Sequence, residues 1–394
     1  MLTRNGYQRL AREIQADERK ALRSLSEAFT AKEIKPEEFS IRQLAEHVVP
    51  DGREWVASMD PRYGDSTYQE AAGAVSLAAF SNITGQIVYN KMLESYNKEE
   101  FVFTNLVQTI PTQFSGEKIP GVGGLGDNAA IVDEGKPYPL VGLNEDWIET
   151  PATLKRGFMV PVTKEAVFFD RTNLVLQRAG EVGDFLGVNK EIRIIDAIVD
   201  ENTTAARYKW KGTTYATYQA TTPWVNIAAS NALVDWTDID AALLVAAAIV
   251  DPNTGLPIVN IGSDMVVCQQ LVATAARVLN ATQVAVHVGG YATSGNLNSS
   301  SSPNPVMGLN GYSPASYTIR TSKLLSSRMA TKTSWFIGDV RKAFAYMENW
   351  PLAVVQAPPN SEAEFTQDIV MRFKASERGA AATLDPRHMV KSTA

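Results

Sequence analysis

The chain contains little cysteine and little histidine: one cysteine and three histidines occur among its 394 residues. A single cysteine excludes a disulfide bond within the chain and leaves no basis for a cysteine-based zinc site. Cys268 ends the apolar run MVVC, and no activating group is nearby in the sequence. We therefore interpret Cys268 as a small buried hydrophobic residue and not as a reactive thiol.

The three histidines give no local metal or catalytic motif. His47, His287 and His388 are far apart in the sequence, and none belongs to an H-x-x-x-H or H-E-x-x-H pattern. No Gly-x-Ser-x-Gly elbow accompanies them, although a triad built from distant residues stays open at this point. His287 alternates with valines, which is typical of a strand residue. We expect no enzyme activity, no metal site and no cofactor.

The sequence also has no excess of positive charge and no long hydrophobic run. Its net charge of −6 argues against tight, charge-driven binding of nucleic acid, while a local basic patch remains compatible with it. The longest apolar run, residues 241–250, is shorter than the ~18–20 residues of a membrane helix. The N-terminus has no apolar signal core. We expect a soluble protein made in a reducing compartment.

The N-terminal segment predicts amphipathic helices. Residues 1–48 are rich in charge but keep one apolar stripe, and residues 40–43 form a plausible capping box for a helix at 41–48. The stripe consists of Leu10, Ile14, Leu22, Leu25 and Phe29. It must be buried either on the body of the chain or on another subunit. A second helical region is predicted at 66–96, and a strand at 101–110.

Residues 116–151 form a glycine-rich, proline-bounded stretch that is far longer than the usual connection of about 4–6 residues. Strand-like fragments at 129–132 and 146–149 indicate a long two-stranded excursion. Because a lone hairpin is only marginally stable, we expect a neighbouring subunit to order it. The G-x-G-x-x-G match at 121–126 lacks a following helix, so we favour a flexible loop over dinucleotide binding.

Charged residues gather in this excursion. We interpret them as solvated charges or as ion pairs with a neighbouring subunit, each worth about 0–1 kcal/mol. Asn97, Gly116 and Pro151 are the candidate hinges of the arm and the loop. The candidate contact residues are Lys118, Asp133, Glu134, Lys136, Glu145, Asp146 and Trp147.

A single long helix is predicted at 170–201, with Asp170 as its N-cap. Gly180, Gly183 and Gly187 are spaced along one side of it. Each glycine costs about 1 kcal/mol relative to alanine inside a helix, so we expect another backbone to approach that side closely. Further on, the patterns predict a hairpin at 208–224, helices at 241–250 and 269–280, and strands at 265–268, 316–319, 335–337, 353–356 and 369–373.

The order of these segments resembles that of the major capsid proteins of tailed bacteriophages over most of residues 97–394. The motifs that carry the resemblance are EFVFTNLVQTIP at 100–111, TPATLKRGFMVPVTKE at 150–165, FIGD at 336–339, MRFKASERG at 371–379 and DPR at 385–387. The extended loop and its returning strand precede the long helix, as in that family. Each motif is degenerate, so the resemblance lies in their order.

The resemblance implies an α+β fold, the tailed-phage major capsid fold. It implies an N-terminal helical arm at 1–96, followed at 97–234 by part of a peripheral domain with the extended loop 116–151 and the spine helix 170–201. An axial domain at 235–334 follows, and the C-terminal strands at 335–394 complete the peripheral domain. In this family the arm and loop clasp adjacent subunits.

The resemblance further implies a structural subunit that forms hexamers and pentamers in an icosahedral or prolate head enclosing double-stranded DNA. The expected partners are the chain itself, a portal protein, a scaffold and, weakly at the inner surface, the packaged DNA; no membrane is expected. The expected location is the virion, after assembly in the host cytoplasm. Two alternatives stay open: a shell protein of an encapsulin-like nanocompartment, and an enzyme with a glycine-rich lid.

Overall fold

The computed structural model describes residues 4–49, 51–58, 74–121, 132, 134–135, 146–202, 204–252, 254–258, 262–280, 283–287, 299–303, 317–357 and 368–393. These residues belong to two compact units. The first unit contains residues 1–99, 155–189 and 350–378. The second contains residues 100–154, 190–349 and 379–394. The expected α+β class is confirmed, since both units combine helices with sheet strands.

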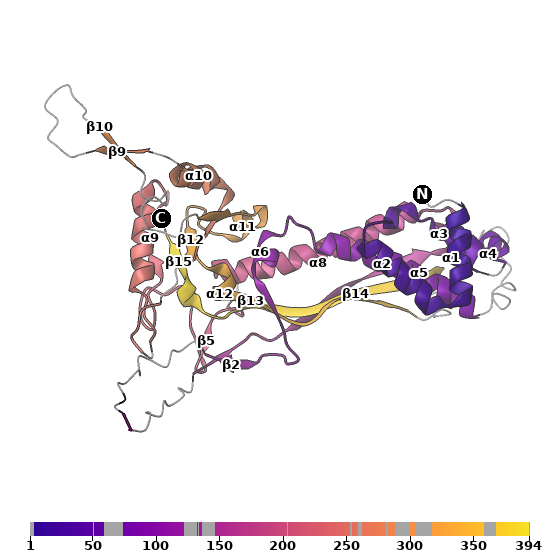
Figure 1. Cartoon of the computed structure of the whole chain (residues 1–394), viewed down its shortest axis with the longest axis horizontal. Helices are drawn as coiled ribbons and strands as arrows, with labels where there is room; N and C mark the ends of the chain where they lie inside the picture. The colour runs from indigo at the N-terminus through magenta and orange to yellow at the C-terminus, as the bar shows by residue number, and fades with distance from the viewer. Residues whose placement is uncertain are drawn as a thin grey trace. The chain divides into compact units, whose positions relative to one another are not determined.

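The N-terminal helices of the first unit bury their apolar stripe on their own chain. These helices are α1 (Arg4–Ala16), α2 (Glu18–Thr30), α3 (Ile41–Val48) and α4 (Gly52–Ser58), gathered beside α5 (Ala74–Tyr96) (Figure 1). Ile14, Leu25 and Phe29 are buried in one cluster with Phe80 and Ile83 of α5, and Leu10 and Leu22 pack against it. The apolar stripe therefore belongs to the core of the first unit.

The start of α3 is the predicted one, whereas the start of the long helix is not. Ser40 is the N-cap of α3, and its hydroxyl accepts a hydrogen bond from the Gln43 N–H at 3.1 Å. The long helix α8 runs from Thr172 to Val199. Asp170 is not its N-cap: its φ is +50°, and its carboxylate accepts hydrogen bonds from the hydroxyls of Ser40 and Thr172, each at 2.8 Å. Asp170 thus ties the start of α3 to the start of α8.

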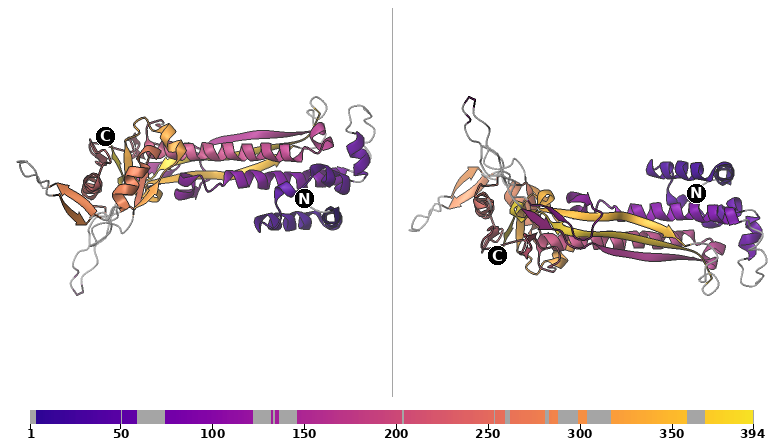
Figure 2. Two further views of the ribbon diagram at one scale, coloured as in Figure 1. Left: turned by 90° about the horizontal axis from the view of Figure 1, so that it is seen from above. Right: turned by 90° about the horizontal axis from the view of Figure 1, so that it is seen from below.

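Segments of three strands complete the first unit, namely residues 350–356, 369–378 and 155–163. The order β13 (Phe344–Gln356), β14 (Ile369–Thr383), β4 (Leu154–Thr163) leaves β4 at the edge. Val160, Val162, Met371, Phe373 and Ala375 are buried in the cluster that holds the α5 side chains. Figure 2 shows α5 and α8 side by side in both views. The short helix α7 (Lys164–Phe168) connects β4 to the turn before α8.

In the second unit, the strand predicted at 101–110 is wrong over most of its length. Residues Val102–Leu106 form the helix α6, and only Gln108–Pro111 form a strand, β1, which pairs in parallel with residues 345–348 of β13. The reason is a distant carboxylate. Glu191 accepts hydrogen bonds from the N–H groups of Phe103 and Thr104, at 3.0 and 2.6 Å, which satisfies the free donors at the start of α6.

A five-stranded sheet forms the largest sheet of the second unit. Its order is β11 (Thr318–Arg320), β8 (Asp264–Val267), β12 (Trp335–Gly338), β15 (Met389–Ser392) and β7 (Ile227–Ala228). Helices α9 (Trp236–Ala248) and α10 (Val272–Asn280) supply apolar side chains to the same cluster as Met265, Trp335 and Ile337. Helix α9 begins earlier than predicted, because Asp235 and Asp238 form a capping box. Cys268 is buried, as predicted.

Small strand pairs and short helices make up the rest of the second unit. A four-stranded antiparallel sheet has the order β2 (Lys118–Pro120), β3 (Trp147–Glu149), β5 (Lys209–Trp210), β6 (Thr213–Thr214). Strands β9 (Gln283–His287) and β10 (Ser299–Pro303) form a separate hairpin, which confirms a strand at His287. Helices α11 (Lys323–Arg328) and α12 (Val340–Ala343) are short. Among the helices in the described part of the chain, none is long and apolar enough to cross a membrane.

Candidate subunit-contact site

The two legs of the glycine-rich excursion are joined at their base. Strands β2 and β3 pair antiparallel, with Lys118 opposite Glu149, Ile119 opposite Ile148, and Pro120 opposite Trp147. The Thr150 N–H donates to the Glu117 carbonyl at 2.9 Å, and the Glu117 N–H donates to the Thr150 hydroxyl at 2.8 Å. The two ends of the excursion are therefore held together at one position, which we call the loop root (residues 116–121 and 146–151).

Three of the candidate contact residues make contacts within the loop root. The Lys118 ammonium lies over the Trp147 ring, 4.0 Å from its centroid. The Trp210 indole N–H donates a short hydrogen bond to the Asp146 carboxylate, and the Gly121 N–H donates to the Asp146 carbonyl at 2.8 Å. These contacts join the loop root to β5. A role of Lys118, Asp146 and Trp147 at another subunit stays a prediction.

The other candidates of the excursion are placed only in part. Glu134 is exposed, at a turn with Gly135, whose φ is +82°. A glycine suits that turn, because L side chains rarely adopt such a φ. Asp133, Lys136 and Glu145 lie outside the described residues, as does most of the strand predicted at 129–132.

The candidate hinges differ in their surroundings. Asn97 is exposed directly after α5, and its N–H donates to the Leu93 carbonyl at 3.1 Å. Gly116 has a φ of +80°, and a Cβ added there would lie 3.6 Å from the Thr150 carbonyl oxygen. Pro151 is buried. Gly116 and Pro151 thus flank hydrogen-bonded residues of the loop root, and motion about them stays a prediction.

Gly180 and Gly183 lie at the contact between α8 and α5. A Cβ added to Gly183 would lie 2.3 Å from the Met92 carbonyl oxygen, and one added to Gly180 would lie 3.3 Å from the Ser95 hydroxyl. Gly187 is also buried. The approaching backbone at Gly183 belongs to the same chain and the same unit.

Sequence reasoning missed a charged group at the end of α8 in the second unit. Glu191 is fully buried, and Lys190 is nearly so. The Lys190 ammonium lies 3.5 Å from the Glu348 carboxylate and 4.4 Å from the centroid of the Tyr346 ring. Arg193 donates to the Tyr346 hydroxyl at 2.9 Å and to the Gly379 carbonyl at 3.1 Å. No local signal could reveal these residues, because charged side chains on a helix are usually solvated.

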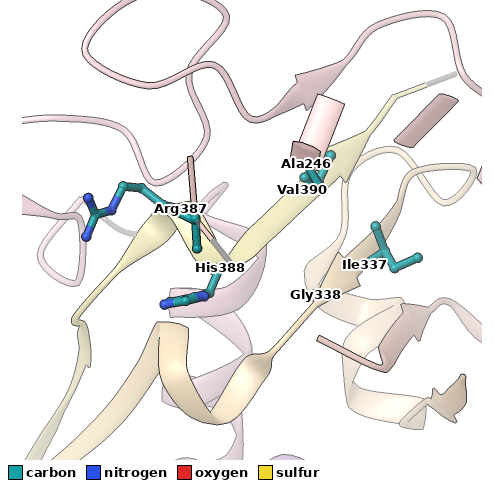
Figure 3. Close-up of a pocket in the computed structure, with 7 residues that line it drawn as sticks. Ala246, Ile337, Gly338, Arg387, His388 and Val390 are labelled. Carbon is teal, nitrogen blue, oxygen red and sulfur yellow. The ribbon is translucent and has the colours of Figure 1, made fainter. Parts of the chain in front are cut away.

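Arg387 and His388 line a small cavity between α9, β12 and β15 (Figure 3). Its volume is about 10 Å³, which is room for roughly one water molecule and not for an organic substrate. Arg387 forms ion pairs with Asp385 at 2.8 Å and Asp251 at 3.3 Å. Burial lowers the pKa of His388, although Asp385, 3.3 Å from its Nε2, opposes that shift. The arrangement fixes the turn before β15.

His47 and His388 belong to different units of the structure. His47 stacks on Tyr7 in the first unit, with ring centroids 6.1 Å apart, whereas His388 belongs to the second unit. In the described part of the chain, no three metal-binding side chains gather into a possible metal site.

Comparison with known proteins identifies one family. A family model described as phage capsid protein matches residues 148–392. No curated protein matches the chain. Among solved structures, a virus-like particle protein from Pyrococcus furiosus has 11% identity and a TM-score of 0.41, covering 77% of this chain and 96% of that one. The capsid of a native GTA particle has 11% identity and a TM-score of 0.46, covering 75% and 90%.

Proposed function

Because the chain belongs to the phage capsid protein family, whose model matches residues 148–392, we propose that its glycine-rich excursion fastens it to neighbouring copies in a closed shell. The chain is a structural subunit of a capsid, and as such it is a component of the virion. A capsid subunit assembles with further copies of itself. The open question is which parts of this chain make the contacts between copies.

The loop root is the observation that supports this proposal. It holds both legs of the excursion by paired backbone hydrogen bonds and by the Lys118–Trp147 and Trp210–Asp146 contacts. The sequence between the legs is interrupted by glycines and prolines, and a lone two-stranded hairpin is only marginally stable in water. A fixed root with a long extension suits a contact made outside the subunit, and Glu134 is exposed at a turn of that extension.

The finer features of the assembly belong to the same proposal. Hexamers and pentamers of the chain form an icosahedral or prolate head around double-stranded DNA, assembled in the host cytoplasm. A portal protein and a scaffold take part, and the packaged DNA contacts the inner surface weakly, in keeping with the net charge of −6. Family membership favours this over a nanocompartment shell, and the family role is structural rather than enzymatic.

Electron microscopy of a shortened variant tests the proposal. Replacing residues 122–145 by a short Gly-Ser linker keeps β2 and β3. We expect a variant with the circular dichroism and thermal unfolding of the folded wild-type subunit that no longer forms closed shells. Closed particles of normal size from this variant would show that the excursion is not needed for assembly. A variant that loses its fold would be replaced by one shortened only over 125–141.

A further inference from the structure

Another cavity of the second unit lies beside the loop root. Its volume is about 470 Å³, far larger than that of the cavity between α9, β12 and β15, and within the ~300–1,000 Å³ of small-molecule sites. Its lining comes from β1, the two legs of the loop root, α12 with its N-cap, and the turn before β15. Pro120 and Arg341 in this lining are exposed, so the cavity opens to the surface. We call it the root cavity.

The wall of the root cavity beside β2 and β3 is apolar. Ile119 and Ile148 are opposite each other in the β2–β3 pair, so their side chains share one face. Ile148 is buried in the cluster that holds Trp335 and Ile337, whereas Ile119 and Leu384 pack against that cluster and are half-buried. The chain itself therefore covers these apolar side chains only in part.

Two acidic side chains line the root cavity, and each already has a cationic partner. The Asp339 carboxylate, at the N-cap of α12, lies 3.5 Å from the Lys342 ammonium. The Asp385 carboxylate accepts hydrogen bonds from two nitrogens of the Arg387 guanidinium, at 2.8 and 3.0 Å. These two pairs leave no negative charge free to face a ligand.

The positive charge of Arg341, by contrast, is not balanced. Arg341 is exposed and forms no ion pair in the part of the chain that the structure describes. His388 adds no charge at neutral pH, since burial lowers its pKa from the ordinary 6.5. A guanidinium is always charged at physiological pH, and its paired N–H groups match the oxygens of carboxylates and phosphates. The root cavity therefore combines an apolar wall with one uncompensated cation.

We propose that the root cavity binds a small amphipathic anion, a compound with an apolar body and one acidic group. The acidic group pairs with Arg341, and the apolar body covers Ile119, Ile148 and Leu384. This site goes beyond the proposed role of the excursion and does not depend on it. Because the ligand binds only the folded subunit, it also stabilises that subunit against unfolding.

The lining of the root cavity argues against two larger occupants. Nucleic acid is held by several cations along its phosphate backbone, whereas here the free cation is Arg341 and its neighbours in the lining are apolar or already paired. A stable protein–protein contact extends over about 1,000 Å² of surface or more. A bounded cavity of about 470 Å³ instead has the size of a site for one small molecule.

Fluorescence titration of the folded, unassembled subunit with two matched dyes tests the proposal. Anilinonaphthalene sulfonate carries aromatic rings and one anionic group, and N-phenylnaphthylamine has the same rings without the charge. We expect one saturable site per subunit for the sulfonate dye, and at least tenfold weaker binding of this dye by Arg341→Gln. The neutral dye should bind Arg341→Gln and wild type within a factor of two. Lys332→Gln is the matched control, because Lys332 is exposed in the same unit and does not line the root cavity.

Two further measurements locate the dye and define its chemistry. Ile119→Trp fills the root cavity and should weaken binding of both dyes, while its circular dichroism stays that of the wild type. Dodecanoate should displace the sulfonate dye, and uncharged dodecanol should do so at least tenfold less well. If Ile119→Trp does not fold, Arg341→Gln still decides, because its side chain is exposed.

Three results would overturn the proposal. The first is equal binding of the sulfonate dye by wild type and Arg341→Gln, which would show that the dye binds elsewhere. The second is equally tight binding of the two dyes by wild type, which would show that the cation plays no part. The third is loss of the dye site when the subunit assembles into particles, which would assign the root cavity to a neighbouring copy.

Discussion

Gly183 of α8 lies against the main chain of Met92 in α5, so closely that an added Cβ would be 2.3 Å from the Met92 carbonyl oxygen. Real Cβ atoms do not approach a backbone oxygen that closely, and the oxygen cannot rotate away as a side chain could. The two helices can therefore keep their present separation only with glycine at this position. The close approach of α5 and α8 at this point therefore depends on Gly183.

We expect Gly183→Ala to destabilise the subunit by about 1–3 kcal/mol, the usual cost of overpacking. Alanine is favoured over glycine by about 1 kcal/mol inside a helix, and this gain offsets part of the overpacking cost. Gly180→Ala is the matched control, because its Cβ would lie 3.3 Å from the Ser95 hydroxyl, a side chain that can move. Urea unfolding of both variants is the measurement. Equal stability of Gly183→Ala and wild type would show that α5 and α8 separate freely.

Replacing Glu191 should weaken the second unit. Its carboxylate accepts hydrogen bonds from the N–H groups of Phe103 and Thr104 and from the Thr104 hydroxyl at 2.6 Å. Glu191→Ala leaves these donors without an acceptor in a buried place, which costs about 1–3 kcal/mol for each unsatisfied group. Glu181→Ala, at an exposed position of the same helix, should change stability by less than about 0.5 kcal/mol.

The measurement for Glu191 is the free energy of unfolding, together with hydrogen exchange of the Phe103 and Thr104 amides. Faster exchange at those amides than in the Glu181→Ala control would confirm that the carboxylate holds the start of α6. Unchanged exchange would show that α6 is held by the buried Phe103 side chain alone.

These two positions also show what the sequence could and could not predict. The capped start of α3, the strand at 335–337 and the helix 269–280 depend on residues close together in the chain, and their positions agree with the structure to within a few residues. Helix α6 was predicted as a strand, because the carboxylate that caps it is 88 residues away from Phe103. Asp170 was misassigned for the same reason, since one of its partners, Ser40, is 130 residues away.

In the candidate site, too, features set by neighbouring residues could be predicted and contacts with other strands could not. The excursion could be recognised from its glycines and prolines, because these residues limit local structure. The intrachain partners of Lys118 and Asp146 could not be predicted, because they lie on other strands: Trp147 on β3 and Trp210 on β5. Charge alone suggested contacts with a neighbour, whereas aromatic rings of the same unit already contact these two residues.

The stability of the second unit should decrease as the pH falls below neutrality. Burial lowers the pKa of His388 from its ordinary 6.5, whereas Asp385 and Asp339 act in the opposite direction and Lys342 and Arg387 reinforce the lowering. The unfolded chain therefore binds a proton at a higher pH than the folded chain. Neutral His388 contributes to the free energy of unfolding above about pH 6.5. This contribution is lost as the pH falls from there toward the lower pKa of the folded state.

Urea unfolding at a series of pH values from 7.5 to 5 measures this dependence. His388→Gln should flatten the part of the curve just below pH 6.5, since it removes the titrating group while keeping a polar side chain. The same slope in His388→Gln and in wild type would show that other groups cause the pH dependence.

The last prediction concerns how binding energy is distributed over the contacts of the excursion. A closed shell repeats one subunit in slightly different surroundings, so its contacts must tolerate small changes of angle. Exposed ion pairs tolerate such changes because each contributes only about 0–1 kcal/mol and depends weakly on geometry. Glu134→Ala, Lys136→Ala and Glu145→Ala should therefore each lower the melting temperature of assembled particles only slightly. The triple variant should lower it further and make it more sensitive to salt.

Asp146→Ala should behave differently from its neighbour Glu145→Ala, because Asp146 accepts the hydrogen bond of the Trp210 indole in the loop root. Removing that acceptor leaves a partly buried donor unpaired, at a cost of about 1–3 kcal/mol, so the effect should appear in the unassembled subunit as well as in the particle. Melting temperatures of the unassembled subunit and of the particle therefore distinguish Asp146→Ala from Glu145→Ala. A single change at Glu134, Lys136 or Glu145 that abolishes assembly of a folded subunit would show that one dominant contact, and not many weak ones, holds the excursion to its neighbour.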